Sequence, residues 1–148
     1  MKKLLSTVAI MASLSIPAFA EDMTIDMLNK RDDGAKMVYS EDIARIDVGD
    51  TITWLPTSKG HNVEFIAGPD GWTAPKKSKN GKEVAITFDM PGVYLYQCTP
   101  HKSMGMIALV VVGEGTNDVS GAKVRGKSKK KLKELLACLL YTSPSPRD

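Results

Sequence analysis

The fold is decided by the stretch Val93-Tyr-Leu-Tyr-Gln-Cys98-Thr-Pro-His101-Lys-Ser-Met104-Gly-Met106-Ile-Ala-Leu-Val-Val-Val112. Its two outer parts, 93–97 and 106–112, consist almost entirely of β-branched, aromatic and aliphatic residues. Such runs are typical of strands, whereas the proline and small polar residues between them are typical of a loop. The stretch therefore predicts two strong β-strands joined by a loop over 98–104.

Turn residues divide the chain before this stretch into further short runs of strand character, which is the pattern of a β-sandwich or barrel. These runs are 23–28, 36–39, 43–48, 51–55, 62–65 and 83–88. A connection rich in glycine, proline and lysine, 67–81, is expected to lie on the surface. About eight strands is a usual count for two sheets. The sequence thus predicts a mainly β fold over 21–113, an eight-stranded Greek-key β-sandwich or barrel.

The β pattern stops after residue 113 and gives way to weaker helical signals. Residues 117–123 are expected to form a short helix, and Ser128 is a candidate N-cap for a second helix running to Ala137 or a little beyond. An apolar stripe that begins at Leu132 should pack this helix against the sandwich. We therefore expect a short C-terminal α-helical extension over 114–137.

The first twenty residues have the form of an export signal. Lys2 and Lys3 give a basic start, 4–16 is a short apolar run, and Ala18-Phe-Ala20 is a small-x-small cleavage site. The alternative, a retained N-terminal anchor, is disfavoured because the run is short for a membrane span. We predict removal of 1–20 and a mature chain that starts at Glu21.

The last residues, 138–148, are similar to a translated sequencing-library adaptor and are expected to be non-native. Leucines with helical spacing continue across the proposed junction, which is the one observation against this interpretation. If residues 138–148 belong to the native protein, a disulfide between Cys98 and Cys138 is an alternative to metal ligation by Cys98. Without these residues, Cys98 is a lone thiol in an exported protein, where oxidation threatens it. Metal ligation is then the chemical reason for its presence.

The metal-ligating residues are few and lie in suggestive positions. The chain has only two histidines, His61 and His101, and His101 follows Cys98 by three residues, with Met104 and Met106 just beyond. A thiolate, two imidazoles and a thioether form the ligand set of copper electron-transfer sites. One tight loop can supply three of these ligands, while His61 approaches from a second loop. Four such ligands leave no open position for a substrate, and no histidine remains for a second copper, so an enzyme is not expected.

Both ligand segments resemble those of the cupredoxins, and of the pseudoazurins most closely. The similar stretches are Gly60-His61-Asn62-Val-Glu-Phe65 and the loop from Cys98 to Met106. The resemblance implies one type 1 (blue) copper per chain, with His61, Cys98, His101 and Met106 as ligands. Met104 lies at the shorter spacing of amicyanin-like loops, so the resemblance to pseudoazurins selects Met106.

The residues next to the ligands are expected to support them. Asn62 is predicted to hydrogen-bond the Cys98 loop and tie the two ligand loops together, although an ordinary turn asparagine is the alternative. Pro100 fixes φ and stiffens the loop. Thr99 and Met104 are expected to pack beside the site.

These features predict a periplasmic one-electron carrier and not an enzyme. By resemblance, its partners would be denitrification enzymes such as copper nitrite reductase, with c-type cytochromes as donors. Lys59, Lys77 and Lys102 are candidates for docking acidic partner surfaces, or else form part of a solvated face. The alternative function is periplasmic copper storage or delivery.

Charge argues against a nucleic-acid partner. The formal net charge of the whole chain is +3, and it falls to +1 when the charges of 1–20 and 138–148 are removed. A chain that is not polybasic lacks the electrostatic footprint of a nucleic-acid-binding protein. We further expect a monomer with no membrane association after signal cleavage.

Overall fold

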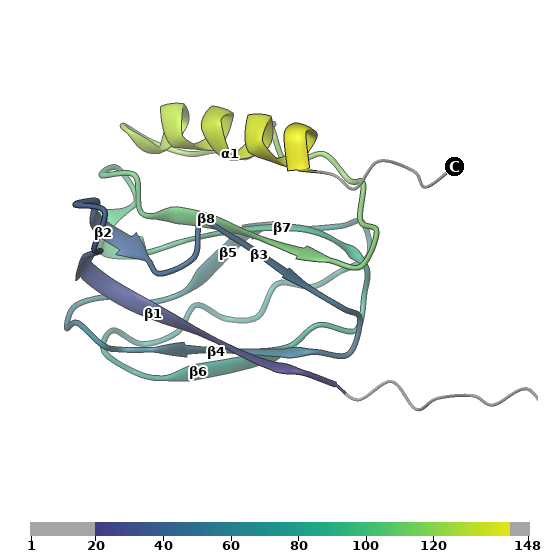
Figure 1. Cartoon of the computed structure of the whole chain (residues 1–148), viewed down its shortest axis with the longest axis horizontal. Coiled ribbons are helices and arrows are strands. Elements are labelled where there is room, and N and C mark those ends of the chain that lie inside the picture. Colours follow the sequence, from purple (N-terminus) through teal and green to yellow (C-terminus); the bar gives the residue numbers. More distant parts are fainter. Residues whose placement is uncertain (1–19, 143–148) are drawn as a thin grey trace, which may run out of the picture.

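The computed structural model describes residues 20–142, which form two β-sheets and one covering helix (Figure 1). The strands are β1 (Asp22–Lys30), β2 (Lys36–Tyr39), β3 (Ile43–Ile46), β4 (Thr51–Leu55), β5 (Glu64–Ala67), β6 (Val84–Thr87), β7 (Gly92–Gln97) and β8 (Ile107–Val112). A short 3-10 helix, Thr99–His101, follows β7, and the α-helix α1 spans Ser128–Thr142. The predicted mainly β fold with a C-terminal helix is confirmed.

The eight strands are divided equally between the two sheets. One sheet has the order β2-β1-β4-β6 and the other the order β3-β8-β7-β5. Two neighbouring pairs, β1 with β4 and β3 with β8, are parallel, and the remaining pairs are antiparallel. Parallel neighbours need long crossover connections, so the chain passes from one sheet to the other instead of forming a simple meander.

β7 and β8 are buried on both faces because their sheet lies between the β2-β1-β4-β6 sheet and α1 (Figure 1). Tyr94 and Tyr96 of β7 join the core between the sheets, whereas Leu95 joins a second core under the helix. In β8, Val110 likewise joins the core between the sheets, and Leu109 joins the core under the helix. A strand covered on both faces needs apolar residues at every position, which explains the unbroken apolar run of 107–112.

The core between the sheets is centred on aromatic rings. Trp54 is fully buried, and its ring centroid lies 5.8 Å from that of Phe65, 5.2 Å from that of Tyr96 and 6.4 Å from that of Phe88. Edge-on and tilted arrangements at these separations are the favourable ones for aromatic pairs. Trp54 therefore connects β4 of the first sheet to β5 and β7 of the second.

Helix α1 is held to the sandwich by apolar contacts and by an ionic cluster. Leu132 and Leu135 are buried against the second sheet. Lys131 Nζ lies 2.9 Å from Asp42 Oδ2, and Arg31 Nη1 lies 3.2 Å from Asp42 Oδ1. Partial burial raises the pKa of Asp42, but hydrogen bonds from both cations outweigh it and hold that pKa below its ordinary value. The helix is thus fixed to the β2–β3 connection.

One detail of the predicted extension was wrong. Residues 117–123 form no helix, because the Asn117 side chain accepts a hydrogen bond from Val93 N (2.6 Å) and donates one to Val93 O (2.8 Å). These bonds attach Asn117 to the start of β7, and the segment makes a turn at 120–121. Helix α1 ends at Thr142, and the sequence predicts an end at Ala137 or a little beyond.

The proposed export signal lies almost entirely outside the described residues, as does the end of the adaptor-like tail. Both interpretations stay predictions. Neither Cys98 nor Cys138 is in a disulfide, because Cys98 is buried in the sandwich and Cys138 is exposed on α1. Over residues 20–142, no helix is both long and apolar enough to cross a lipid bilayer.

Candidate metal centre

The fold brings His61, Cys98 and His101 together at the end of the sandwich where β7 ends and β8 begins, and this end is on the left in Figure 1. Cys98 directly follows β7, and His101 ends the 3-10 helix that comes next. His61 lies in the connection between β4 and β5. Cys98 and His61 are fully buried, while His101 is half-buried and reaches the surface.

The three ligand atoms form a compact triangle. His61 Nδ1 and His101 Nδ1 are 3.1 Å apart, and Cys98 Sγ lies 3.7 Å from His61 Nδ1 and 3.4 Å from His101 Nδ1. The point equidistant from all three atoms is about 2 Å from each, close to the bond length between a transition metal such as zinc and an imidazole nitrogen. The donor set of one thiolate and two imidazoles suits copper. The residues therefore fit the metal that the sequence predicts.

The two candidate methionines differ sharply in burial. Met106 is fully buried and belongs to the same core cluster as Cys98, whereas Met104 is 49% exposed. The backbone brings Met106 back to the site, because Cys98 N donates a 3.0 Å hydrogen bond to Met106 O. Of the two, Met106 is the methionine that lies inside the protein, in the core cluster that contains Cys98.

Asn29 is the main site residue that the sequence analysis missed. Its Oδ1 lies 2.8 Å from His61 Nε2, so the imidazole donates from Nε2 and presents Nδ1 to the other two ligand atoms. A partner on the second ring nitrogen fixes both the tautomer and the orientation of a ligating histidine. Nothing in the local sequence marks Asn29, which lies at the end of β1.

Asn62 connects the two ligand loops. Its Oδ1 accepts a 2.7 Å hydrogen bond from Thr99 N, and its Nδ2 donates to Thr99 Oγ1 (3.0 Å) and to Ser78 O (3.2 Å). Its backbone carbonyl accepts a 2.7 Å bond from the Tyr39 hydroxyl. Asn62 is 3% exposed, so these bonds are sheltered from water. The geometry is the one expected of a residue that ties the loops together, while Pro100 lies exposed at the rim.

Burial sets the protonation of the unliganded site. Burial raises the pKa of the Cys98 thiol, although backbone hydrogen bonds from the neighbouring residues oppose it. Burial and the nearby His101 imidazole lower the pKa of His61. The Cys98 thiol and the His61 imidazole are therefore neutral near pH 7 without a metal. Since a thiolate is the metal ligand, metal binding displaces a proton from Cys98.

Comparison with known proteins agrees with this site. The family model for copper-binding proteins of the plastocyanin/azurin family matches residues 25–113. The chain belongs to this family. The matched range includes all of the predicted copper ligands and ends just after β8.

Several cupredoxins that are similar to the chain are pseudoazurins. The chain is 43% identical over 120 residues to pseudoazurin of Methylorubrum extorquens, covering 80% of each protein. It is 39% identical over 144 residues to a putative pseudoazurin of Rhizobium leguminosarum bv. viciae, covering 96% of this chain and 93% of the relative. The crystal structure of pseudoazurin from Hyphomicrobium denitrificans superposes with a TM-score of 0.74 at 34% identity, covering 80% of this chain and 98% of that one. The resemblance to pseudoazurin is confirmed, as is copper as the cofactor, and the family supports a copper electron carrier.

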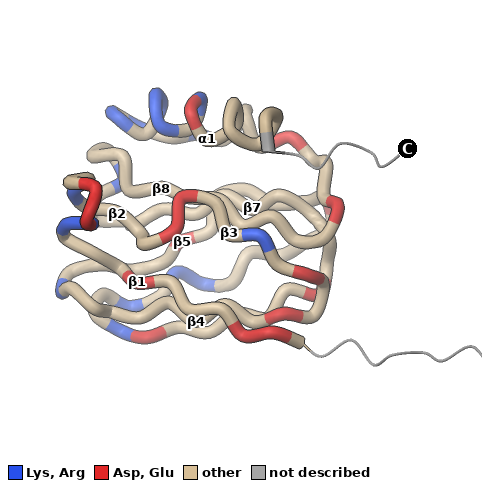
Figure 2. The backbone as a smooth tube through the Cα atoms, in the orientation of Figure 1, with Lys and Arg blue, Asp and Glu red and all other residues tan. Residues whose placement is uncertain are grey.

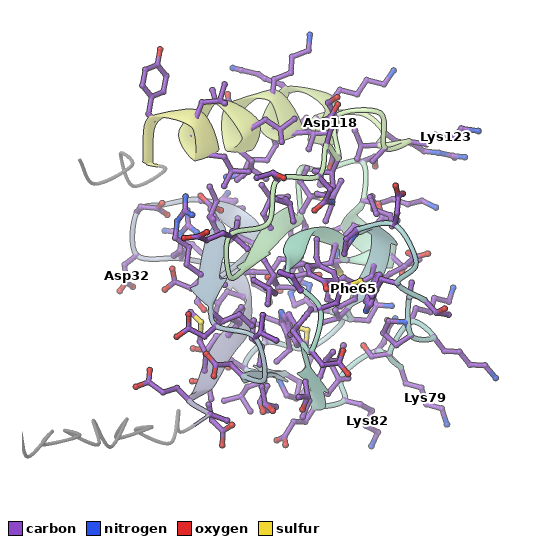
Figure 3. All side chains as sticks on the ribbon, turned by 90° about the vertical axis from the view of Figure 1, so that its right-hand side faces the viewer. Asp32, Phe65, Lys79, Lys82, Asp118 and Lys123 are labelled. Carbon is purple, nitrogen blue, oxygen red and sulfur yellow. The ribbon has the colours of Figure 1, made fainter. Side chains whose placement is uncertain are left out.

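The predicted docking lysines lie near the metal end of this cupredoxin. Lys59 and Lys77 are exposed and Lys102 is half-exposed. Figure 2 shows acidic segments along the right-hand end of the molecule, away from the ligand loop, with most basic segments towards the left. Lys79 and Lys82, from the long connection before β6, point away from the body in Figure 3. Charge is therefore unevenly distributed between the two ends.

Replacing Asn29 with alanine is expected to lower the copper affinity by about tenfold to a hundredfold, as the loss of a partner to a ligating histidine typically does. Stability of the copper-free cupredoxin should barely change, because the Asn29 residue is exposed. Competition titration against a chelator measures the affinity, and Lys30→Ala, the next position of β1, is the control. An affinity equal to that of the unmodified protein would show that the contact between Asn29 and His61 does not position the ligand.

Proposed function

We propose that the chain is a periplasmic one-electron carrier whose copper is held by His61 Nδ1, Cys98 Sγ, His101 Nδ1 and the Met106 thioether. The observation that carries the proposal is the triangle of donor atoms that the fold holds together, with sides of 3.1, 3.4 and 3.7 Å. Such preorganisation suits electron transfer, because the ligands need not move when the charge of the metal changes.

The surrounding residues keep the donor atoms in place and exclude water. Bound copper supplies the one-electron exchange between Cu(I) and Cu(II). Asn29 orients His61, and Asn62 holds the backbone next to Cys98. His101 is the histidine ligand that reaches the surface, so electrons are expected to enter and leave on its side of the molecule.

The proposed partners are redox proteins with acidic docking surfaces. Lysines near the metal end support this, because they complement negative charge and raise the rate of association. We propose copper nitrite reductase as an acceptor, c-type cytochromes as donors, and a monomeric carrier that moves between them.

Burial of the methionines argues against copper storage or delivery. A storage protein would present clusters of exposed methionine or histidine, yet Met27 is fully buried, and Met23 and Met37 are packed against the core. Repeated electrochemical reduction and oxidation distinguishes an electron carrier from a storage or delivery protein. The copper content per chain is measured before and after the cycles. Constant copper content over many cycles supports the carrier, whereas loss on reduction would favour delivery.

Replacing Lys102 with glutamate is expected to slow electron transfer to an acidic partner about tenfold at low ionic strength and to have little effect at high salt. Stopped-flow measurement of the bimolecular rate against salt concentration, with copper nitrite reductase as the partner, tests this. Arg45→Glu makes the same change in charge on β3, opposite Val111 and away from the ligand loop. Equal effects of the two substitutions, or an unchanged salt dependence for Lys102→Glu, would rule out docking at Lys102.

A further inference from the structure

Two successive carbonyls of the ligand loop receive hydrogen bonds from the start of helix α1. Ser128 Oγ donates to Lys102 O at 2.7 Å, and Lys127 N donates to Ser103 O at 2.9 Å. These carbonyls follow His101 directly in the chain. The start of α1 therefore contacts the part of the loop that lies between His101 and Met106.

Apart from the bonds that join Thr99, near the start of the loop, to Asn62 and Glu64, the other hydrogen bonds of the loop are made within it. His101 N donates to Cys98 O at 3.1 Å, Met104 N donates to His101 O at 2.9 Å, and Cys98 N donates to Met106 O at 3.0 Å. These bonds close the loop on itself but fix only its two ends to the sandwich. The bonds from Ser128 and Lys127 are attachments of its middle to another element.

The contact is close and sheltered. Ser128 is fully buried. Gly126 has a φ of +55°, and a Cβ atom at this position would lie 2.4 Å from Ser103 O, so only glycine permits the approach. The sequence makes Ser128 a candidate N-cap of its own helix, but its hydroxyl donates to the loop instead. A buried hydroxyl with a 2.7 Å bond is costly to remove.

The start of α1 is itself anchored to the sandwich rather than carried by the loop. Leu132 and Leu135 are buried against the second sheet, and Lys131 is paired with Asp42. The attachment therefore connects the ligand loop to a fixed part of the fold.

We propose that Ser128 is a positioning residue for the copper site, which acts through the Lys102 carbonyl to hold His101 and the loop after it. The inference rests on the proposed copper ligands, since His101 is one of them. Loss of the hydroxyl should let the middle of the loop move away from α1, so that His101 leaves the ligand triangle more often. Copper would then be released faster, although Ser128 contacts no ligand atom.

Ser128→Ala tests the proposal with two measurements. Amide hydrogen exchange of His101 and Met104 is followed in the copper-free protein, and the rate of copper transfer to a chelator is followed in the copper-loaded protein. We expect both rates to rise about tenfold, the factor that corresponds to losing one hydrogen bond of ordinary strength.

Two controls separate positioning from general destabilisation. Ile52→Val removes one methylene group from the core of the first sheet and should lower stability by a similar amount without touching the loop. Ser120→Ala removes a serine hydroxyl that bonds only to Asp118 in the described structure. Faster loop exchange and copper release in Ser128→Ala, with neither control altered, support the proposal.

The proposal is overturned if Ser128→Ala matches the unmodified protein in both measurements or if Ile52→Val changes them as much. Failure of the proposed ligand set would be seen differently, as the absence of an intense thiolate-to-copper absorption band in the unmodified protein. The exchange measurement needs no copper, so the two failures are distinguishable.

Discussion

Replacing Cys98 with alanine is expected to abolish the intense thiolate-to-copper absorption band and to lower copper affinity by more than about a hundredfold, beyond the loss caused by removing a residue that only supports a ligand. The thiolate supplies the only negative charge among the four proposed ligands. Its sulfur lies 3.4 and 3.7 Å from the two imidazole nitrogens, so its removal opens one corner of the site. Absorption and EPR spectra of the Cu(II)-loaded proteins, together with a chelator titration, measure both effects.

Cys138→Ser is the matched control, because Cys138 is an exposed thiol on α1 far from the ligand triangle. The control should keep the band, the narrow copper hyperfine splitting of a blue site and the affinity. A thiolate-to-copper band that survives in Cys98→Ala would show that the band comes from another sulfur atom. A pale, ordinary Cu(II) spectrum in the unmodified protein would mean that the site does not form as proposed.

Replacing Trp54 with alanine is expected to lower the free energy of unfolding by about 3–5 kcal/mol, the usual cost of truncating a buried aromatic residue. The ring is fully buried and contacts Phe65, Phe88 and Tyr96, so no surface loop can collapse into the space. A loss of this size is a large share of the stability of an ordinary domain. Urea denaturation of the copper-free protein, followed by circular dichroism, measures it.

Trp54→Phe separates the ring from its N–H group. Among the described residues, Trp54 Nε1 is buried without a hydrogen-bond partner, so its removal forfeits no bond. We therefore expect Trp54→Phe to cost clearly less than Trp54→Ala. Val48→Ala, at a position that is 50% exposed, should change stability by less than about 0.5 kcal/mol. Equal losses of unfolding free energy in Trp54→Phe and Trp54→Ala would show that the packing of an aromatic ring at position 54 does not hold the sheets together.

Much of the β-sandwich could be predicted because local pattern and tertiary environment agree. The apolar run of β8 is long because both of its faces are covered, and glycine or proline marks the turns on either side of β7. Strand ends were less predictable. The third strand ends at Ile46 and not at Val48, because the Asp50 side chain accepts a hydrogen bond from Asp47 N and forms a turn there.

The proposed ligand set was visible in the sequence because three of its members lie within nine residues and the chain has only two histidines. The residues that hold these ligands were not visible. Asn29 meets His61 from a strand 32 positions away, and its identity follows from the packing of β1 beside the β4–β5 connection. No short-range pattern encodes such a contact.

The errors in the predicted C-terminal extension also arise from contacts between residues far apart in the sequence. Asn117 and Ser128 have side chains that compete for backbone groups, and local rules give them turn or capping roles. In the folded chain, Asn117 bonds to the backbone of Val93, and Ser128 bonds to Lys102. Both partners lie more than twenty positions away, so the tertiary contact overrides the local preference.

The place of β8 also determines when the protein can fold. It is hydrogen-bonded to β3 on one side and to β7 on the other, and it contributes alternate residues to both hydrophobic cores. A growing chain that has not reached Val112 therefore lacks the strand that joins β3 to the sheet and the β8 residues of each core. Packing of this sheet against the other sheet and against α1 can be completed only once β8 is in place, and the ligand loop, which leads into β8, is held at both ends only then.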